Sequence, residues 1–372
     1  MKVLICIPCL LTGGTEVQTL SLAKALLTSG HEVTTVCYYE FAQEMVKQYE
    51  EAGCKVICLQ PEGKRINGIR GIWFLFRGLR HTVKTIKPDI AHVQYMAPGA
   101  IPIVLLRLLG VRKVIATTHT MADIYPNLRL VHFVQRHLVL AFTCITKKAE
   151  ESFFGTSTLY TCKLALGKRN HFTIYNTLPS YISVINSNRH FNTPITIGVV
   201  SRLEYIKGMD MVVPAFAEAH TRYPETSLLI VGDGNLQKYM KQQVIDAELS
   251  DSVTFVGRQQ NTSLQSLYDK IDILLVPSRS EGFGLTALEG MARGCVIVAA
   301  NIGGLPEVLV DGEAGLLHRS SSTGQLSDRI VNLLSDTELM KKLSRQAVIR
   351  AKDFSFNTYL MAISNFYSKL EQ

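Results

Sequence analysis

The chain has 372 residues, of which 47% are hydrophobic and 19% charged, a composition typical of an ordered globular protein rather than a disordered one. This length fits two domains of about 150–200 residues better than one core, and no apolar run reaches the ~18 residues of a membrane-spanning helix. The net charge of +8 is uneven, because residues 1–190 hold 22 basic and 11 acidic residues, against 17 and 20 afterwards. The basic first half is therefore expected to face an anionic partner.

The first half of the chain alternates short apolar segments with amphipathic ones. An apolar strand over residues 3–9 is followed by Gly13-Gly14 and a helix over 15–27. This start lacks the small-residue cleavage site of a signal peptide, so we expect a cytoplasmic protein. Further strands are predicted at 31–39, 55–59, 90–93, 113–117, 140–146 and 172–175, with a long helix ending near Lys87 before the fourth strand of the chain.

A second round of the same alternation begins at residue 195. Its strands are predicted at 195–201, 227–231, 253–256, 273–276, 295–299 and 315–318. Residues 178–194 are rich in Ser, Asn and Pro and show little periodicity, which indicates a linker. Three helices, over about 322–334, 337–352 and 355–370, follow the last strand.

Repeated β-α-β units with nearly continuous apolar strands predict parallel sheets that are buried on both faces. Two rounds in series indicate the α/β class, with two Rossmann-like, doubly wound domains over residues 1–185 and 186–353. Such domains bind ligands at the carboxyl ends of their strands, so we expect an interdomain cleft to hold the ligand.

Two glutamates flank a glycine turn that follows the fourth strand of the second round. Glu281 and Glu289 lie on either side of this turn and the helix start. Backbone N–H groups at a helix start attract an anion, and carboxylates accept paired hydrogen bonds from sugar or ribose hydroxyls. The pattern predicts a nucleotide-sugar pocket, although either acid alone could be an ordinary helix-start or surface residue. The turn and helix start between them consist of Gly282, Phe283, Gly284 and Leu285.

Two cations bracket a helix start after the first strand of the second round. Arg202 and Lys207, together with the helix dipole, would share the charge of a diphosphate. We therefore expect no metal ion and no other cofactor. Taken alone, the two residues could equally be a solvated basic pair.

Glycines follow several other strands. Gly13 and Gly14 would let the backbone approach a ligand at the start of the first helix. This loop lacks the Gly-x-Gly-x-x-Gly fingerprint and its ribose-binding acid, which argues against a nicotinamide cofactor. In the second half, Gly232, and Gly257 with Arg258, would leave room for a flat base, and each could also be simple turn chemistry.

A histidine, His119, follows a strand of the first half within the segment Thr117–Thr120. At the carboxyl end of a strand, its imidazole could hydrogen-bond a sugar hydroxyl or move a proton near neutral pH. A structural role is the alternative for a lone histidine among the ten in this chain.

A basic helix accounts for much of the charge of the first half. From Gly63 to Pro88 there are seven Lys or Arg residues and no acid. Such a helix could pack its apolar side on the sheet, or residues 64–87 could dock on an anionic membrane surface with Trp73 at the interface. Nucleic acid is not expected, because no binding motif is present. The apolar side consists of Ile69, Ile72, Trp73, Phe76, Leu79, Val83 and Ile86.

With these motifs the chain resembles the family 4 retaining glycosyltransferases of the GT-B fold, over essentially its whole length. The Glu281–Glu289 pair matches the E-x7-E motif of that family, and Gly13-Gly14-Thr15-Glu16 matches its GGxE loop. The segment from Arg202 to Lys207 matches its diphosphate grip.

The resemblance implies a role for each motif. Arg202 and Lys207 would bind the donor diphosphate, and Glu289 the ribose. Glu281 would hold the donor sugar, together with the backbone of residues 282–285. The catalytic residues implied in this way are His119, Glu281, Arg202 and Lys207.

The resemblance also implies an activity. It is the metal-independent, retaining transfer of a sugar from a UDP- or GDP-linked donor to a glycan or lipid-linked acceptor, in cell-surface polysaccharide or glycolipid synthesis. Front-face attack is favoured, so that Glu281 is not required as a nucleophile. The segment 354–372 would cross back to the first domain, and the protein would work in the cytoplasm or at the inner face of the membrane. A nucleotide-sugar 2-epimerase of the same architecture and a non-catalytic nucleotide-sugar-binding subunit are the alternatives.

Overall fold

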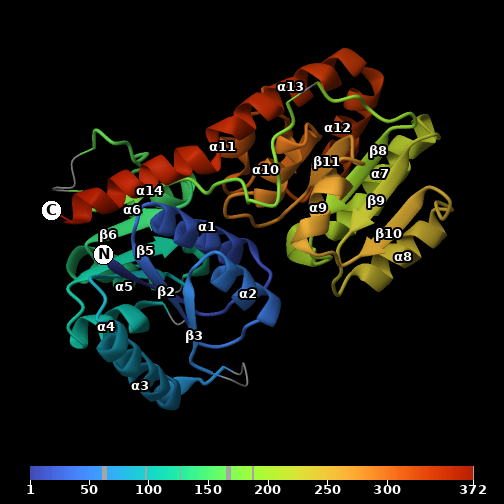
Figure 1. The fold of residues 1–372 in the computed structure, drawn as a ribbon. Helices are drawn as coiled ribbons and strands as arrows, with labels where there is room; N and C mark the ends of the chain where they lie inside the picture. Colours follow the sequence, from blue (N-terminus) through green and yellow to red (C-terminus); the bar gives the residue numbers. More distant parts are fainter. Residues whose placement is uncertain (61–64, 97–98, 126, 165–168, 187, 372) are drawn as a thin grey trace. The chain divides into compact units, whose positions relative to one another are not determined.

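The computed structural model describes residues 1–60, 65–96, 99–125, 127–164, 169–186 and 188–371 (Figure 1). It divides into two compact units. The first unit consists of Met1–Thr177 and Phe356–Gln372, and the second unit of Leu178–Ser355. The boundary expected after residue 185 therefore falls inside the second unit, and the last helix groups with the first.

The first unit is built on a seven-stranded sheet in which all paired strands are parallel. Its order is β3-β2-β1-β4-β5-β6-β7, so the direction of winding reverses between β1 and β4. The strands are β1 (Lys2–Ile7), β2 (Glu32–Cys37), β3 (Lys55–Cys58), β4 (Ile90–Gln94), β5 (Lys113–Thr118), β6 (Ala141–Cys144) and β7 (His171–Thr173).

Helices cover both faces of this sheet (Figure 1). Right-handed crossovers that run in opposite directions along a sheet place their helices on opposite faces. Helices α3, α4, α5 and α6 accordingly pack in succession on one face, while α1 packs against α2 and α14. The helices are α1 (Gly14–Thr28), α2 (Gln43–Glu51), α3 (Gly68–Ile86), α4 (Ala100–Leu108), α5 (Leu128–His137), α6 (Lys147–Phe154) and α14 (Phe356–Glu371), with a 3₁₀ turn at Ala122–Ile124.

The second unit repeats this plan with a six-stranded sheet of order β10-β9-β8-β11-β12-β13, again with parallel pairs. Its winding reverses between β8 and β11. The predicted α/β class with two doubly wound parallel sheets is thereby confirmed. The strands are β8 (Thr196–Val200), β9 (Ser227–Val231), β10 (Val253–Gly257), β11 (Ile273–Val276), β12 (Val296–Ala300) and β13 (Leu316–His318).

The helices of the second unit fall into two groups. Helix α7 packs against α8 and α12, and α10 packs against α9, α11 and α13. Two 3₁₀ turns, η2 (Tyr205–Lys207) and η3 (Met209–Met211), precede α7. The helices are α7 (Val212–Arg222), α8 (Gln237–Asp246), α9 (Asn261–Tyr268), α10 (Leu285–Ala292), α11 (Leu305–Leu309), α12 (Thr323–Ser335) and α13 (Thr337–Asp353).

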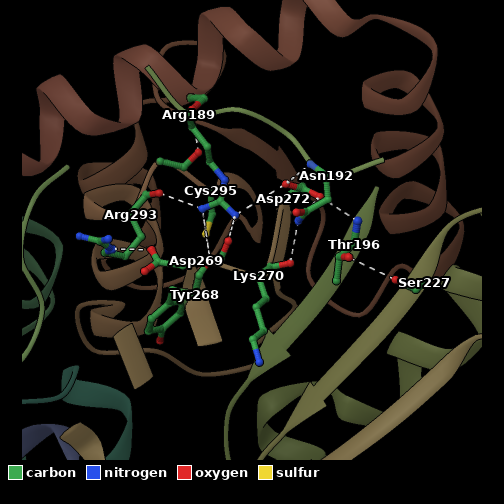
Figure 2. A network of polar contacts seen from close by, with 12 residues as sticks. Arg189, Asn192, Thr196, Ser227, Tyr268, Asp269, Lys270, Asp272, Arg293 and Cys295 are labelled. Atoms are coloured by element: carbon green, nitrogen blue, oxygen red, sulfur yellow. Dashed lines mark hydrogen bonds and ion pairs between the residues drawn. The ribbon is translucent and has the colours of Figure 1, made fainter. Parts of the chain in front are cut away.

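The described residues of the segment predicted to be a linker belong to the second unit and are held there by polar contacts (Figure 2). Arg189 lies 3.6 Å from the Asp272 carboxylate, which also accepts hydrogen bonds from the side-chain and main-chain nitrogens of Asn192. These contacts bind the segment to the sheet at the start of β11. The segment shows no hydrophobic periodicity because polar side-chain contacts, and not a regular apolar face, hold it in place. The Arg189 guanidinium also donates to the main-chain oxygens of Tyr268, Asp269 and Arg293 at 2.8–3.1 Å.

The basic helix α3 buries only part of the apolar side that the sequence predicts. Its buried residues are Gly71, Leu75, Leu79 and Thr82. Phe76 and Val83 pack against the core, but Ile69, Ile72 and Trp73 do not pack on the sheet as one of the two alternatives predicted. Those three side chains are 86%, 42% and 60% exposed. The predicted apolar side covers more of the helix surface than the core can contact, so only the residues nearest the sheet are buried. Lys64 of the proposed membrane contact lies outside the described residues. Within the described parts of the chain, every helix is too short or too polar to span a bilayer.

Candidate functional site

The site of the second unit lies where β8 and β11 are neighbours and the strand order reverses. The carboxyl ends of two strands that wind apart leave a crevice, which is where doubly wound sheets bind ligands. The loop after β8 carries Arg202 and Lys207, and the loop after β11 carries Glu281. The topology therefore brings the two loops with the predicted charged residues to one edge.

Lys207 and Glu281 meet at this edge. The Nζ atom of Lys207 lies 2.8 Å from Oε2 of Glu281, and the side chains are 21% and 18% exposed. The Ser278 hydroxyl donates to the same carboxylate oxygen at 3.3 Å. A pair that is partly shielded from water interacts more strongly than a surface pair, yet a ligand can still reach it.

The start of α10 adds partial positive charge next to Glu281. Gly284 has φ +99° and precedes the first helical residue, Leu285, and no side chain caps the helix. The N–H groups of a first helical turn lack acceptors within the helix, so they suit an anion such as a phosphate. The Phe283 side chain is buried and packs edge-on against Phe354, so it serves the core. The predicted role of residues 282–285 thus rests on their main chain.

Two glycines allow the main chains of these loops to pack closely: Gly208, which ends the predicted diphosphate-grip motif, and Gly303, which was not predicted from the sequence. A Cβ atom on Gly303 would lie 1.7 Å from the main-chain oxygen of Glu281, and one on Gly208 would lie 2.0 Å from that of Pro277. Both glycines have positive φ. The sequence signal was Gly303-Gly304 after a predicted strand, which is easily taken for an ordinary turn.

The remaining predicted residues of this edge follow β8, β9 and β10. Arg202 is 66% exposed and forms an ion pair with Glu204 at 2.8 Å. Gly232, with φ +134°, approaches Ser201 so closely that a Cβ atom would lie 1.8 Å from its oxygen, and its N–H donates to Gly257. Arg258 is exposed beyond Gly257. These residues follow neighbouring strands, and among them Lys207 and Glu281 form an ion pair while Gly232 donates a hydrogen bond to Gly257.

Glu289 lies apart from the other charged residues, in a buried position. Its carboxylate accepts hydrogen bonds from the hydroxyls of Tyr181 at 2.7 Å and Tyr268 at 2.6 Å. Burial raises the pKa of Glu289 to about 7, and the two hydrogen bonds oppose that rise. The ribose-binding role of Glu289 stays a prediction. Neither tyrosine was found from sequence, since Tyr181 lies in the supposed linker and Tyr268 in a helix.

In the first unit, Gly13 and Gly14 form the start of α1 after β1. Gly13 caps the helix without a side chain, and a Cβ atom there would lie 2.5 Å from Oε2 of Glu16. Glu16 is buried, and its carboxylate accepts a hydrogen bond from the Cys9 thiol at 3.2 Å. The loop is therefore a compact turn in which the Glu16 carboxylate packs against Gly13.

His119 is buried at the carboxyl end of β5. Its Nε2 lies 2.6 Å from Oε1 of Gln94, the last residue of the neighbouring strand β4. Burial lowers the pKa of His119 to about 4, so the imidazole is neutral near pH 7 and donates to the amide oxygen. A neutral histidine can hydrogen-bond and orient a hydroxyl group, but it provides no positive charge to bind an anion.

A second group of polar side chains lines the same small cavity as His119 in the core of the first unit. His92 contacts the hydroxyls of Tyr367, at 2.7 Å, and Thr117, at 2.5 Å. Burial lowers the pKa of His92 to about 3. His92, Gln94 and His119 line a cavity of about 20 Å³, room for one water molecule. Among the described residues, the Nε2 atom of Gln94 has no hydrogen-bond partner.

The described residues contain no cluster of three or more His, Cys, Asp or Glu side chains placed to hold a metal ion.

Two families match this chain, one in each unit. Residues 12–153 match Glycosyltransferase Family 4, and residues 183–350 match Glycosyl transferases group 1. The first match lies in the first unit and the second in the second unit.

Named relatives agree with these matches. The N-acetyl-alpha-D-glucosaminyl L-malate synthase of Bacillus anthracis is 30% identical over 270 residues, which cover 70% of this chain and 68% of that protein. An uncharacterized glycosyltransferase of Methanocaldococcus jannaschii is 33% identical over 164 residues, covering 44% and 45%. For this and four further relatives, the chain spans only 37–45% of their own length.

Solved structures share the fold over the whole chain. HepE of Anabaena, crystallised with UDP and glucose, has a TM-score of 0.79 and 19% identity, and 99% of both chains is covered. Sucrose-phosphate synthase of Thermosynechococcus elongatus has a TM-score of 0.78 and 19% identity, covering 100% of this chain and 99% of that one. The chain therefore belongs to the family 4 glycosyltransferases, which have the GT-B fold.

Proposed function

We propose that this glycosyltransferase moves a hexose-type sugar from a UDP- or GDP-linked donor to a glycan or lipid-linked acceptor, with retention and without a metal ion. The observation that carries the proposal is the contact of Lys207 with Glu281 at 2.8 Å, in the loops that follow the neighbouring strands β8 and β11. Next to it lies the start of α10, which no side chain caps. A cation, a carboxylate and free helix N–H groups are what a sugar diphosphate requires.

Each group has a distinct task in the proposed reaction. Lys207, Arg202 and the first turn of α10 stabilise the negative charge that grows on the diphosphate as it departs. Glu281 accepts hydrogen bonds from the sugar. The bond between the anomeric carbon and the phosphate oxygen breaks, the acceptor oxygen bonds to the same face, and its proton passes to the departing phosphate. The cations and helix dipole replace the metal ion that would otherwise neutralise this charge.

The relatives support the sugar-transfer part of the proposal. HepE was crystallised with UDP and with UDP-glucose, and other relatives are named D-inositol 3-phosphate glycosyltransferase. These names fit a nucleotide-sugar donor and a hydroxyl acceptor for this chain.

The surface of the first unit supports an acceptor at a membrane. Helices α3, α4 and α5 pack in succession and carry several exposed apolar side chains. They also expose several arginines, and the segment from 65 to 88 contains no acid. Apolar and basic side chains on one face suit an anionic lipid surface, so we infer a peripheral position on the inner membrane face. The exposed apolar residues include Ile69, Ile72, Trp73, Val104, Leu108, Leu130 and Phe133.

A donor screen tests the function. Purified protein is tested with a panel of UDP- and GDP-linked sugars, by thermal shift and by release of nucleoside diphosphate. A donor present at 100 times its Kd should stabilise the fold by about 2.7 kcal/mol. Lys207→Ala should lower donor turnover by about 10²- to 10³-fold, because it removes a charge at the leaving group.

Lys341→Ala is the matched control, because Lys341 also lies 2.8 Å from a glutamate, Glu338, but on the exposed surface of α13. It should keep full turnover. Unchanged turnover in Lys207→Ala, or no response to any donor, would refute the proposal. Product from donor alone, identified by NMR as a C2 epimer, would favour epimerisation instead.

A further inference from the structure

The side chain of Arg279, three residues after β11, is bound on several sides. Its guanidinium donates to both carboxylate oxygens of Asp210, at 2.6 and 2.8 Å, and to the main-chain oxygen of Tyr205 at 2.7 Å. It lies over the Tyr205 ring, 3.8 Å from its centre, and its Nε donates to Ser321 at 3.2 Å. Four of its five N–H groups are thereby engaged.

These contacts enclose the 3₁₀ turn that carries Lys207. Tyr205 begins the turn, Lys207 ends it, and Asp210 lies in the next turn. The main-chain N–H of Arg279 donates to the oxygen of Ile206 at 2.8 Å, between these two points. Arg279 therefore ties the loop after β8 to the loop after β11 with its main chain and its side chain.

The turn has few other means of support. Tyr205 and Ile206 are 61% and 47% exposed, so little apolar area fixes their position. Gly208 allows close approach to Pro277, but a glycine only permits a conformation and does not select it. The Arg279–Asp210 pair is 17% and 23% exposed and bidentate, which makes it the strongest polar contact of this turn.

The same contacts make Arg279 a poor anion ligand itself. Asp210 neutralises the charge of Arg279, and the planar guanidinium is already bound to the Asp210 carboxylate. Lys207, in contrast, has a long unbranched side chain whose reach depends on where its turn lies. A shift of that turn would move the ammonium group relative to Glu281.

We propose that Arg279, paired with Asp210, is a positioning residue that holds Lys207 where it grips the donor diphosphate. This inference rests on the function proposed above. It assigns Arg279 and Asp210 to the alignment of the phosphate-binding loop and leaves contact with the ligand to Lys207.

Binding of a nucleoside diphosphate and of its nucleoside separates positioning from a general structural role. The Kd values of UDP and uridine, and of GDP and guanosine, are measured by calorimetry. Arg279→Gln and Asp210→Asn should each weaken the diphosphate that the wild type binds by about tenfold, through misplacement of Lys207. Binding of the nucleoside should change less than twofold, because it does not involve Lys207. Arg279→Lys should restore part of the loss.

Two controls accompany these variants. Arg293→Gln removes a similar pair, with Asp269 at 2.8 Å, at the carboxyl end of α10 and thus opposite its phosphate-binding start, and should leave both Kd values unchanged. In a Lys207→Ala background, Arg279→Gln should have little further effect, since the group that it positions is gone.

The outcomes distinguish the two proposals. If the wild type binds neither diphosphate, the proposed function fails and this inference falls with it. If the wild type binds a diphosphate but Arg279→Gln leaves its Kd unchanged, or weakens nucleoside and diphosphate equally, the positioning role alone is overturned. Full additivity with Lys207→Ala would also overturn it.

Discussion

The two units share one architecture and differ in what lies at the reversal of strand order. In the second unit, the loops after β8 and β11 hold two charged pairs, Lys207 with Glu281 and Arg279 with Asp210. In the first unit, β4, which lies at the reversal, and its neighbour β5 carry His92, Gln94 and His119, a buried group of neutral side chains.

This difference follows from burial. The charged pairs of the second unit keep about a fifth of each side chain exposed, so their charges remain solvated and can be exchanged for those of a ligand. His92 and His119 of the first unit are buried, and burial disfavours their charged form. The same fold thus offers a site for an anion in one unit and a neutral hydrogen-bonding site in the other.

The largest expected consequence is acid sensitivity of the first unit. His92 and His119 have pKa values lowered from 6.5 to about 3 and about 4, so the unfolded chain binds more protons than the native one below pH 6.5. Their contribution to stability is complete above pH 6.5 and is lost as the pH falls, by about 5 kcal/mol between pH 7 and 4.5 for the two together. Hydrogen exchange at several pH values should show protection lost first in β1, β4 and β5.

His119→Gln should remove roughly half of this pH dependence, since it cannot be protonated. His81→Gln, at an exposed position on α3, should change nothing. Equal acid loss in both units, or an unchanged profile in His119→Gln, would contradict the contrast between the units.

Glu289 gives the second unit the opposite pH dependence. Its pKa is raised from 4.5 to about 7, so the native state binds the extra proton in that range. The contribution to stability is complete below pH 4.5 and is lost as the pH rises to 7, by about 3 kcal/mol. Hydrogen exchange in α9 and α10 should therefore be faster at pH 8 than at pH 5, and Glu289→Gln should flatten this change. A second unit that becomes more stable from pH 5 to 8 because of Glu289 would break the comparison.

Gly303→Ala tests whether the charged pair depends on close main-chain packing. The new methyl group would meet the Glu281 oxygen at 1.7 Å, so Glu281 must shift. A shift of about 1 Å at a catalytic group should lower donor turnover by about 10²-fold. Gly312→Ala is the control, because Gly312 also has positive φ, +77°, but no atom lies within 4 Å of its added Cβ. It should cost stability without a comparable loss of turnover, and equal turnover loss in both variants would count against the packing argument.

The smallest effect concerns the exposed apolar face of the first unit. Trp73→Ser should lower binding to vesicles with anionic lipid by about tenfold, because an interfacial tryptophan is lost. The free energy of unfolding should change by less than about 0.5 kcal/mol, since Trp73 is 60% exposed. Ile245→Ser, on α8 of the second unit and 61% exposed, should not alter vesicle binding. Equal losses in the two variants would assign the binding to general apolar exposure.

The periodicity of the sequence was enough to predict both sheets. Strands such as β9 (Ser227–Val231) and β11 (Ile273–Val276) were predicted at their observed bounds. Short continuous apolar runs that are bounded by turn residues are typical of buried strands. The wrong predictions concern which part of an element finds a partner. On α3, apolar spacing could not show that Ile69, Ile72 and Trp73 face away from the sheet. In the supposed linker, no periodic pattern in the sequence indicated that Arg189 would contact residues of the second sheet and its helices.

The candidate site divides in the same way. Lys207 and Glu281 were found from the sequence, because charges beside a glycine turn after a strand have a local signature. Arg279, Asp210 and Tyr181 were not, because their partners lie 69 or 108 residues away in the chain. No local pattern encodes such pairs.

The sequence by itself determined the alternation of elements, the two parallel sheets and the loops that carry charge, since each depends on neighbours within one turn or one strand. Only the tertiary structure decided which charges meet and which residues are buried. Strand order brings Lys207 to Glu281, and burial leaves Glu289 between two tyrosines and His119 neutral beside Gln94. These outcomes depend on desolvation and on contacts across the sheet, which the linear order of residues does not specify.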